Sequence, residues 1–163
     1  MRLEVFFDYA CPYCWKGHQL LLELLPSYQQ IEVIWRPCES HPRPERYGVH
    51  SDLLIQGMYY AAENGVGLLA YHERAYELIW KRRVNVENAV TLADSFSDML
   101  DADGLLQALI NGKYQSVQQD ANDYAFERSG VWVVPAYRMD GRRLDSIEDV
   151  YITRAQLNAF LRA

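Results

Sequence analysis

The sequence predicts an α/β protein whose elements follow in the order strand, helix, strand, helical block, strand, strand, helix. The first observation behind this is a run of strand-forming residues that ends directly at a Cys-Pro-Tyr-Cys motif. A long middle stretch of helical pattern and a hairpin signal near the C-terminus complete the order. At 163 residues, the chain has the length of one ordinary domain, or of one domain that carries an insertion.

The composition is that of a folded protein with neither a nucleic-acid nor a membrane partner. Half of the residues are apolar and 13% are aromatic, far more than a disordered chain carries. The net charge is -6 and the basic residues are scattered, which argues against nucleic acid as the main partner. No stretch approaches the roughly 20 apolar residues of a membrane span, and the N-terminus lacks a leader pattern. We therefore expect a cytoplasmic protein.

The first three predicted elements are a strand, a helix and a second strand. Residues 3–7 form a short run of strand-formers that breaks at Asp8 and leads directly into the Cys-Pro-Tyr-Cys motif at residues 11–14. A leucine-rich pattern then continues the helix until Pro26 stops it. Residues 31–35 predict the second strand, parallel to the first, with the helix as the crossover.

A long helical region follows these elements. Residues 37–50 hold several prolines among polar residues and predict a loop. From residue 51 to residue 128 the pattern is helical, in segments separated by turns that contain glycine, asparagine or aspartate. We interpret residues 51–128 as a helical insertion in a domain made of residues 1–50 and 129–163.

The C-terminal region predicts two strands and a helix. Residues 131–139 are strand-like, and Asp140-Gly141 is a strong hairpin signal. The returning strand is expected to begin at residue 142. Thr153 is expected to cap a final helix that runs to residue 161.

The Cys-Pro-Tyr-Cys motif has the local pattern that activates a thiol. Pro12 suits the first helical position because its missing N–H would have no intrahelical partner there, and Cys11 then falls at the N-cap. The free N–H groups of the first turn and the helix dipole favour a thiolate at Cys11, with a pKa below the ordinary value of about 8.5. Cys14, one turn deeper, can attack a mixed disulfide formed at Cys11. We therefore predict Cys11 as the attacking thiol and Cys14 as the resolving thiol.

A second feature, distant along the chain, fits the same chemistry. Pro135 stands in a predicted strand, where it cannot donate to the sheet ladder, and a cis bond to Val134 is a common explanation. Beside the redox pair, the unpaired backbone of Val134 would hydrogen-bond an extended peptide or glutathione at Cys11. We therefore expect Val134 and Pro135, with Pro12 and Tyr13 of the motif, to face the substrate.

Several segments resemble one known family. Residues 7–17 are similar to the active-site segment of the DsbA-like thioredoxin-fold family, particularly the branch of FrnE-type oxidoreductases and 2-hydroxychromene-2-carboxylate isomerases. Residues 33–37 resemble the family's second strand, residues 71–87 its helical insertion and residues 130–137 its cis-proline strand. The resemblance covers nearly the whole chain in order.

The resemblance implies a thioredoxin fold, β-α-β followed by β-β-α, with an inserted helical domain. It implies that Cys11 attacks, that Cys14 is its partner and that Val134-Pro135 is a cis dipeptide facing the substrate. The chain departs from the family in two places: Cys38 replaces an aromatic or other apolar residue, and residues 145–152 replace the common Gly-Ala-Gln type of segment. These departures bear on the substrate more than on the chemistry.

These features together predict a DsbA-like thiol-disulfide oxidoreductase. Its expected partners are protein thiols or disulfides, or glutathione as a co-substrate, with no bound cofactor. Because Cys-Pro-Tyr-Cys is also typical of glutaredoxins, we expect a reduction potential between roughly -270 mV for thioredoxin and roughly -120 mV for DsbA. A second hypothesis is a glutathione-dependent isomerase or transferase with a small aromatic substrate. Relatives of that kind often lack the second cysteine, so the presence of Cys14 favours dithiol chemistry.

A structural zinc module is the alternative from another class. Cys11, Cys14, Cys38 and His41 have the order and spacing of an acceptable zinc ligand set. An apolar helix rather than a turn follows the second cysteine, however, and a large hydrophobic domain does not need a metal for stability. We therefore expect no metal site.

Other residues of the sequence have two interpretations each. Asp8 either accepts the proton of the resolving step or only ends the strand and shapes the turn. His18, four residues beyond Cys14, either tunes the site or is an ordinary half-exposed histidine. Cys38 is expected to be a small buried hydrophobe rather than a third redox thiol. Four aromatic residues of the helical region either line a substrate cleft or, as their helical spacing favours, belong to the core. They are Tyr59, Tyr60, Tyr71 and Tyr76.

Overall fold

The computed structural model describes residues 1–162 and contains a four-stranded mixed sheet. The strands are β1 (Arg2–Phe7), β2 (Glu32–Pro37), β3 (Ala136–Met139) and β4 (Arg142–Asp145). They lie in the order β2-β1-β3-β4, with β1 parallel to β2 and antiparallel to β3. The predicted parallel first pair and the C-terminal hairpin are therefore confirmed.

The helices attached to this sheet begin and end largely where the sequence predicts. Helix α1 (Pro12–Leu24) connects β1 to β2 and ends in a 3-10 turn, η1 (Leu25–Ser27), which contains the proline expected to stop it. The last helix, α7 (Arg154–Arg162), packs against α1. The Thr153 hydroxyl accepts a hydrogen bond from the Gln156 N–H at 3.2 Å, so the predicted cap is confirmed.

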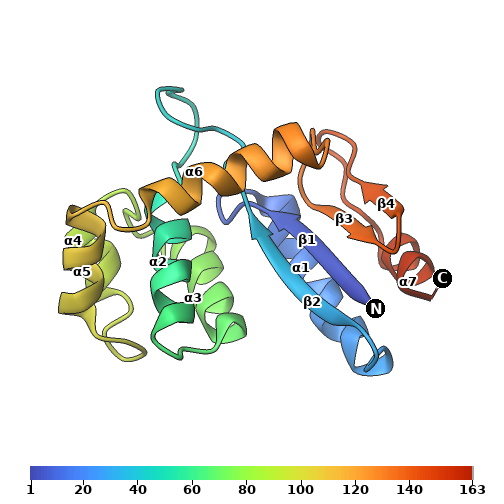
Figure 1. Ribbon diagram of the computed structural model, residues 1–163, viewed down its shortest axis with the longest axis horizontal. Coiled ribbons are helices and arrows are strands. Elements are labelled where there is room, and N and C mark those ends of the chain that lie inside the picture. Colours follow the sequence, from blue (N-terminus) through green and yellow to red (C-terminus); the bar gives the residue numbers. More distant parts are fainter. Residues whose placement is uncertain (163) are drawn as a thin grey trace.

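A block of helices interrupts the sheet fold between β2 and β3. They are α2 (Asp52–Glu63), α3 (Leu68–Trp80), α4 (Ala89–Asp94), α5 (Ala102–Ile110), α6 (Gln115–Asp123) and a π-helical turn, η2 (Tyr124–Arg128). Figure 1 shows α2 to α5 at one side of the sheet, whereas α6 and η2 run from this block across the sheet towards β3. Within the described part of the chain, no helix is long and apolar enough to cross a membrane.

The third strand is shorter than predicted. Of the expected strand at residues 131–139, only Ala136–Met139 pairs in the sheet. Pro135 has no N–H to donate, so the ladder cannot extend through it. The preceding residues therefore form an irregular loop, in which Val131 and Val134 are buried but Trp132 is 92% exposed. The prediction of a strand that begins at residue 131, made from this run of apolar residues, is therefore wrong.

Buried aromatic side chains join the helical block to the sheet domain. Tyr9, in the turn after β1, lies edge-on to both Tyr71 and Tyr76 of α3, with ring centroids 6.1 and 5.3 Å apart. Tyr71 and Tyr76 are almost fully buried and Tyr60 is 8% exposed, as their spacing favours, whereas Tyr59 is only partly buried. The core is therefore continuous from the sheet to α3.

Candidate functional site

The Cys-Pro-Tyr-Cys motif lies at the start of α1, as predicted. Cys11 is the N-cap, with extended backbone angles, and its Sγ accepts a hydrogen bond from the Cys14 N–H at 3.3 Å. Pro12 is the first residue of the helix, where its missing N–H leaves no helical bond unmade. Both motif cysteines are free thiols in this structure.

The two thiols of the motif lie in opposite environments. A hydrogen bond from the Cys14 thiol is the largest effect on Cys11 and lowers its pKa, and the N–H groups of Cys14 and Tyr13 lower it further. Burial and the charge of Asp8 oppose this shift without reversing it. Cys14 is only 1% exposed, and burial raises its pKa well above the ordinary value. The structure therefore favours a thiolate at Cys11 and a thiol at Cys14.

The loop before β3 meets the motif across the chain. The Val134–Pro135 bond is cis, as expected, and the Val134 carbonyl lies 3.7 Å from Cys11 Sγ. Gly17 makes room for this loop, because a Cβ there would stand 3.2 Å from Pro135 Cγ. The Ser146 hydroxyl donates to the Pro135 carbonyl at 2.5 Å and holds the chain after β4 against the same loop. The structure thus brings together the motif and the dipeptide that the sequence singled out.

Asp8 is a buried carboxyl group between β1 and the motif. It accepts hydrogen bonds from the N–H groups of Ala10 and Ser40 at 2.9 and 2.8 Å and from the Ser51 hydroxyl at 2.5 Å. Its own N–H donates to Cys14 Sγ at 3.4 Å. Burial raises the pKa of Asp8, although these hydrogen bonds oppose the rise. Asp8 therefore shapes the turn, and it also places a carboxyl group of raised pKa near the buried thiol.

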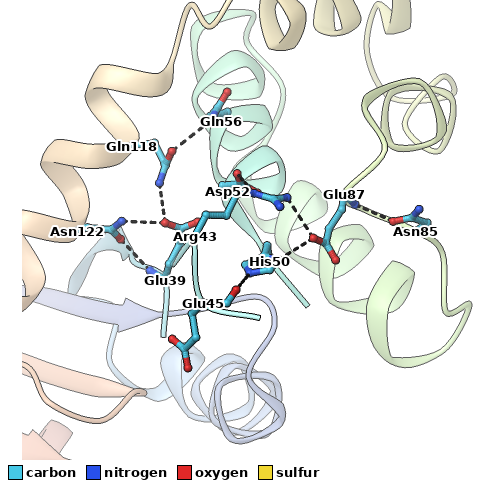
Figure 2. A network of polar contacts seen from close by, with 10 residues as sticks. All are labelled: Glu39, Arg43, Glu45, His50, Asp52, Gln56, Asn85, Glu87, Gln118 and Asn122. Carbon is cyan, nitrogen blue, oxygen red and sulfur yellow. Dashed lines mark hydrogen bonds and ion pairs between the residues drawn. The ribbon is translucent and has the colours of Figure 1, made fainter. Parts of the chain in front are cut away.

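A polar network that the sequence analysis did not find holds the loop after β2 in place (Figure 2). The side chains of Gln118 and Asn122 on α6 both donate to Glu39 Oε2 at 2.9 Å, and the Glu39 N–H donates to Asn122 Oδ1. Burial raises the pKa of Glu39. Figure 2 also shows Arg43 between Asp52 and Glu87, with His50 bonded to Glu87. No local pattern signals this network, because its partners come from separate elements.

The four residues of the zinc alternative are not assembled into a metal site. Across residues 1–162, no group of three or more His, Cys, Asp or Glu side chains is arranged to hold a metal ion. Cys38 is fully buried, with its Sγ 3.6 Å from the Phe7 carbonyl, as expected for a small buried side chain. His41 instead pairs with Glu45 at 2.9 Å on the surface.

His18 is buried among aromatic rings rather than half-exposed. It is 8% exposed, its ring lies 5.6 Å from Trp35 and 5.7 Å from His72, and its Nε2 has no partner among the described residues. Burial lowers the pKa of His18 to about 4 and that of His72 to about 3. His72, which the sequence analysis did not single out, bonds through Nδ1 to the Tyr9 hydroxyl at 2.7 Å. Both imidazoles are therefore neutral at physiological pH.

A pocket of about 400 Å³ opens beside Cys11. Tyr13 and Val134, two of the residues predicted to face a substrate, line it, and so do Phe126 of η2 and the exposed Trp132. Pro12 lies outside this pocket and instead lines a second, more apolar hollow of about 380 Å³, together with Trp15 and Trp80. The site thus presents Cys11 at the edge of a pocket with aromatic walls and leaves Cys14 behind it.

The fold and the site define a thioredoxin-type domain with a helical block between its second and third strands. Residues 2–151 match the model of the DSBA-like thioredoxin domain family, so the chain belongs to this family. Among curated proteins it is similar to the uncharacterized protein YwbO of Bacillus subtilis. The two are 24% identical over an alignment 173 residues long, which covers 84% of this chain and 86% of YwbO.

Solved structures share the same fold. A probable DsbA oxidoreductase from Streptomyces coelicolor aligns with a TM-score of 0.85 at 17% identity, covering 99% of this chain and 88% of that one. A 2-hydroxychromene-2-carboxylate isomerase aligns with a TM-score of 0.70 at 14% identity, covering 89% of this chain and 88% of its own. The DsbA of Chlamydia trachomatis gives 0.70 at 12% identity, with coverage of 99% and 86%. The predicted family and the thioredoxin fold with its helical insertion are confirmed.

Proposed function

We propose that this protein is a thiol-disulfide oxidoreductase in which Cys11 attacks and Cys14 resolves. The observation that carries this proposal is the contrast between the two thiols. Cys11 Sγ accepts a helix N–H, lines the pocket and has a lowered pKa, whereas Cys14 is buried with a raised pKa. Because the thiolate is the nucleophile, the reaction begins at Cys11.

The proposed reduction of a substrate disulfide has two steps. The Cys11 thiolate attacks one substrate sulfur, the substrate S–S bond breaks, and the other sulfur leaves as a thiolate. Cys14 then loses its proton to the Asp8 carboxylate and attacks Cys11 Sγ, which releases the second substrate thiolate and closes the Cys11–Cys14 disulfide. The substrate gains two electrons and the protein loses them. Oxidation of a substrate dithiol follows the same steps in reverse.

Val134 supplies the proposed backbone contact for the substrate. Its carbonyl lies 3.7 Å from Cys11 Sγ, so a segment whose sulfur binds Cys11 passes within hydrogen-bond reach of it. An extended polypeptide can donate an N–H to this carbonyl in the manner of an added strand. Protein disulfides are therefore the proposed substrates, with glutathione as a candidate co-substrate and no bound cofactor.

Matched serine variants of the two cysteines test this proposal. We expect Cys11→Ser to abolish exchange with a dithiol or disulfide substrate. Cys14→Ser should still attack but should accumulate a mixed disulfide, seen by intact-mass spectrometry. Unchanged exchange in Cys11→Ser would refute the proposal. Equilibration of the wild-type protein with glutathione buffers then gives the potential of the pair and the direction of electron flow.

The aromatic pocket also favours a second candidate, a glutathione-dependent isomerase or transferase. A space of about 400 Å³ with aromatic walls beside Cys11 suits a small aromatic substrate, and the fold is shared with a 2-hydroxychromene-2-carboxylate isomerase. In that reaction the glutathione thiolate reacts and the second protein thiol is not needed. Glutathione-dependent turnover of an aromatic substrate that survives Cys14→Ser would support this candidate over dithiol exchange.

A further inference from the structure

The chain after β4, which departs from the family pattern, forms one wall of the pocket beside Cys11. Ser146 is buried and bonds to the Pro135 carbonyl at 2.5 Å. The next residues make a tight turn in which the Val150 N–H donates to the Ile147 carbonyl at 3.0 Å. Asp149 takes a positive φ of 59° in this turn, a conformation that Asp and Asn adopt more readily than most residues. The turn is thereby held against the loop that contacts Cys11.

This turn places two carboxylates at the pocket. Glu148 and Asp149 both line it and both are exposed. The pocket has no lysine or arginine among its lining residues, and its one histidine, His41, bonds to Glu45 at 2.9 Å. Asp8, buried behind the motif, adds a further acidic group that acts on Cys11. The charges around the attacking sulfur are therefore predominantly negative.

Apart from Ser40 and His41, much of the remaining pocket wall is apolar. Trp132 is 92% exposed, and Tyr13 lies against Tyr151 with ring centroids 4.5 Å apart and ring planes tilted by 52°. Ile147, beside the acidic residues, is 72% exposed. Exposed aromatic and aliphatic groups of this kind favour apolar and cationic side chains of a partner, since a cation can also lie over an aromatic face.

We propose that Glu148 and Asp149 form a charge filter that selects polypeptide segments carrying lysine or arginine next to the reacting cysteine, and that disfavours glutathione. Glutathione carries two carboxylates and one ammonium group, so it brings a net negative charge to an acidic pocket. A polypeptide segment with a cationic residue beside its cysteine pairs with the rim and places apolar groups against Trp132. This inference rests on the proposed thiol-disulfide exchange at Cys11 and names its substrate class.

The expected effect is moderate because the carboxylates are exposed. Charges in water a few ångströms apart interact weakly and are screened by salt. We expect the exchange rate constant with a cationic peptide to exceed that with an anionic peptide by about fivefold at low ionic strength. At about 1 M salt the ratio should fall towards one, because the screening length is then about 3 Å.

Three disulfide peptides that differ only in the residues beside cysteine test this filter. They carry lysine, glutamine or glutamate there, and exchange is followed in the wild-type protein and in the double variant Glu148→Gln, Asp149→Asn. Asparagine tolerates the positive φ at residue 149, so the turn is retained. The filter predicts that the ratio of lysine to glutamate rate constants drops to near one in the double variant. The matched control, Glu73→Gln with Asp94→Asn, removes two exposed carboxylates of the helical block and should keep the wild-type ratio.

A binding measurement separates failure of the filter from failure of the proposed function. The same peptides with serine in place of cysteine, carrying a fluorescent label, are titrated by anisotropy. If no peptide exchanges but the lysine peptide still binds several-fold more tightly through Glu148 and Asp149, the oxidoreductase assignment fails and the charge preference stands. Equal binding and exchange of all three peptides, or a preference that persists in the double variant, overturns the filter. So does exchange with glutathione disulfide as fast as with the lysine peptide.

Discussion

The mouth and the buried floor of the candidate site have opposite chemistry, although Cys11 and Cys14 are only one helical turn apart. The mouth consists of Cys11, Tyr13, Val134, Glu148 and Asp149, and the floor consists of Asp8, Cys14, Cys38, His18 and His72. At the mouth a thiol meets a pocket, and its pKa is lowered. On the floor burial raises the pKa values of the acids and lowers those of the imidazoles, so each is shifted towards its neutral form. Cys11 and Cys14 are the same residue type, yet their pKa values shift in opposite directions, so hydrogen bonds from the helix start and the neighbouring thiol, more than residue type, decide the direction here.

The largest expected effect is a loss of stability in acid, when the buried His18 takes up a proton. His18 has a folded pKa of about 4 against about 6.5 in an unfolded chain. Because the folded value is lower, its contribution to stability is full above pH 6.5 and is lost as the pH falls from there towards 4. The loss is roughly 3 kcal/mol in the free energy of unfolding. Asp8 and Glu39, with raised pKa values, act in the opposite direction as they take up protons.

Urea unfolding at several pH values isolates the histidine contribution. The variant His18→Leu removes the imidazole, which makes no hydrogen bond through Nε2, and fills the space with an apolar side chain. Its stability should fall less steeply than that of the wild-type protein between pH 6.5 and 4. His41→Gln, which alters an exposed histidine, serves as the control and should keep the wild-type dependence. Equal dependence in His18→Leu and the wild type would contradict the assignment.

The next effect concerns the proton of the resolving thiol. Asp8→Asn removes the proposed acceptor, and we expect release of the mixed disulfide to slow by about tenfold or more, while the first attack by Cys11 changes less. Rapid-quench measurement of the two steps separates them. Glu39→Gln, the same change at the neighbouring buried carboxyl, should leave the release step within about twofold. If Asp8→Asn slows both steps equally, Asp8 only shapes the turn.

The smallest expected effect comes from displacing the loop that carries Val134 while leaving the side chains of the mouth unchanged. In Gly17→Ala the new Cβ would lie 2.8 Å from the Tyr137 hydroxyl and 3.2 Å from Pro135 Cγ, so the loop carrying Val134 must shift. Better helix propensity offsets part of the clash, and we expect a net loss of about 1 kcal/mol of stability with a few-fold slower attack by Cys11. Gly67→Ala, where no atom lies within 4 Å of the new Cβ, is the control. Wild-type attack rates in Gly17→Ala would show that the loop position does not matter.

Much of the fold could be predicted because the deciding interactions are local. Pro12 and Cys11 fill adjacent positions of one helix start, and their N-cap geometry follows from a few residues. Asp140 and Gly141 both adopt positive φ, which is what their hairpin turn requires. The prediction failed at residues 131–135, where an apolar run was interpreted as a strand. Val131 and Val134 of that run are buried, whereas Trp132 projects into solvent. Only contacts with the rest of the protein decide which of these side chains is buried.

By itself, then, the sequence determined the order of the elements, the candidate thiol pair Cys11 and Cys14 and the N-cap position of Cys11, because each depends on neighbours along the chain. Only the tertiary structure decided what surrounds that sulfur. The Val134 carbonyl comes from 123 residues away, and the Glu39 network joins groups 83 residues apart. Glu148 and Asp149 reach the mouth because Ser146 anchors their turn to Pro135. Burial and charge at a site are sums over such distant partners, and no local pattern encodes them.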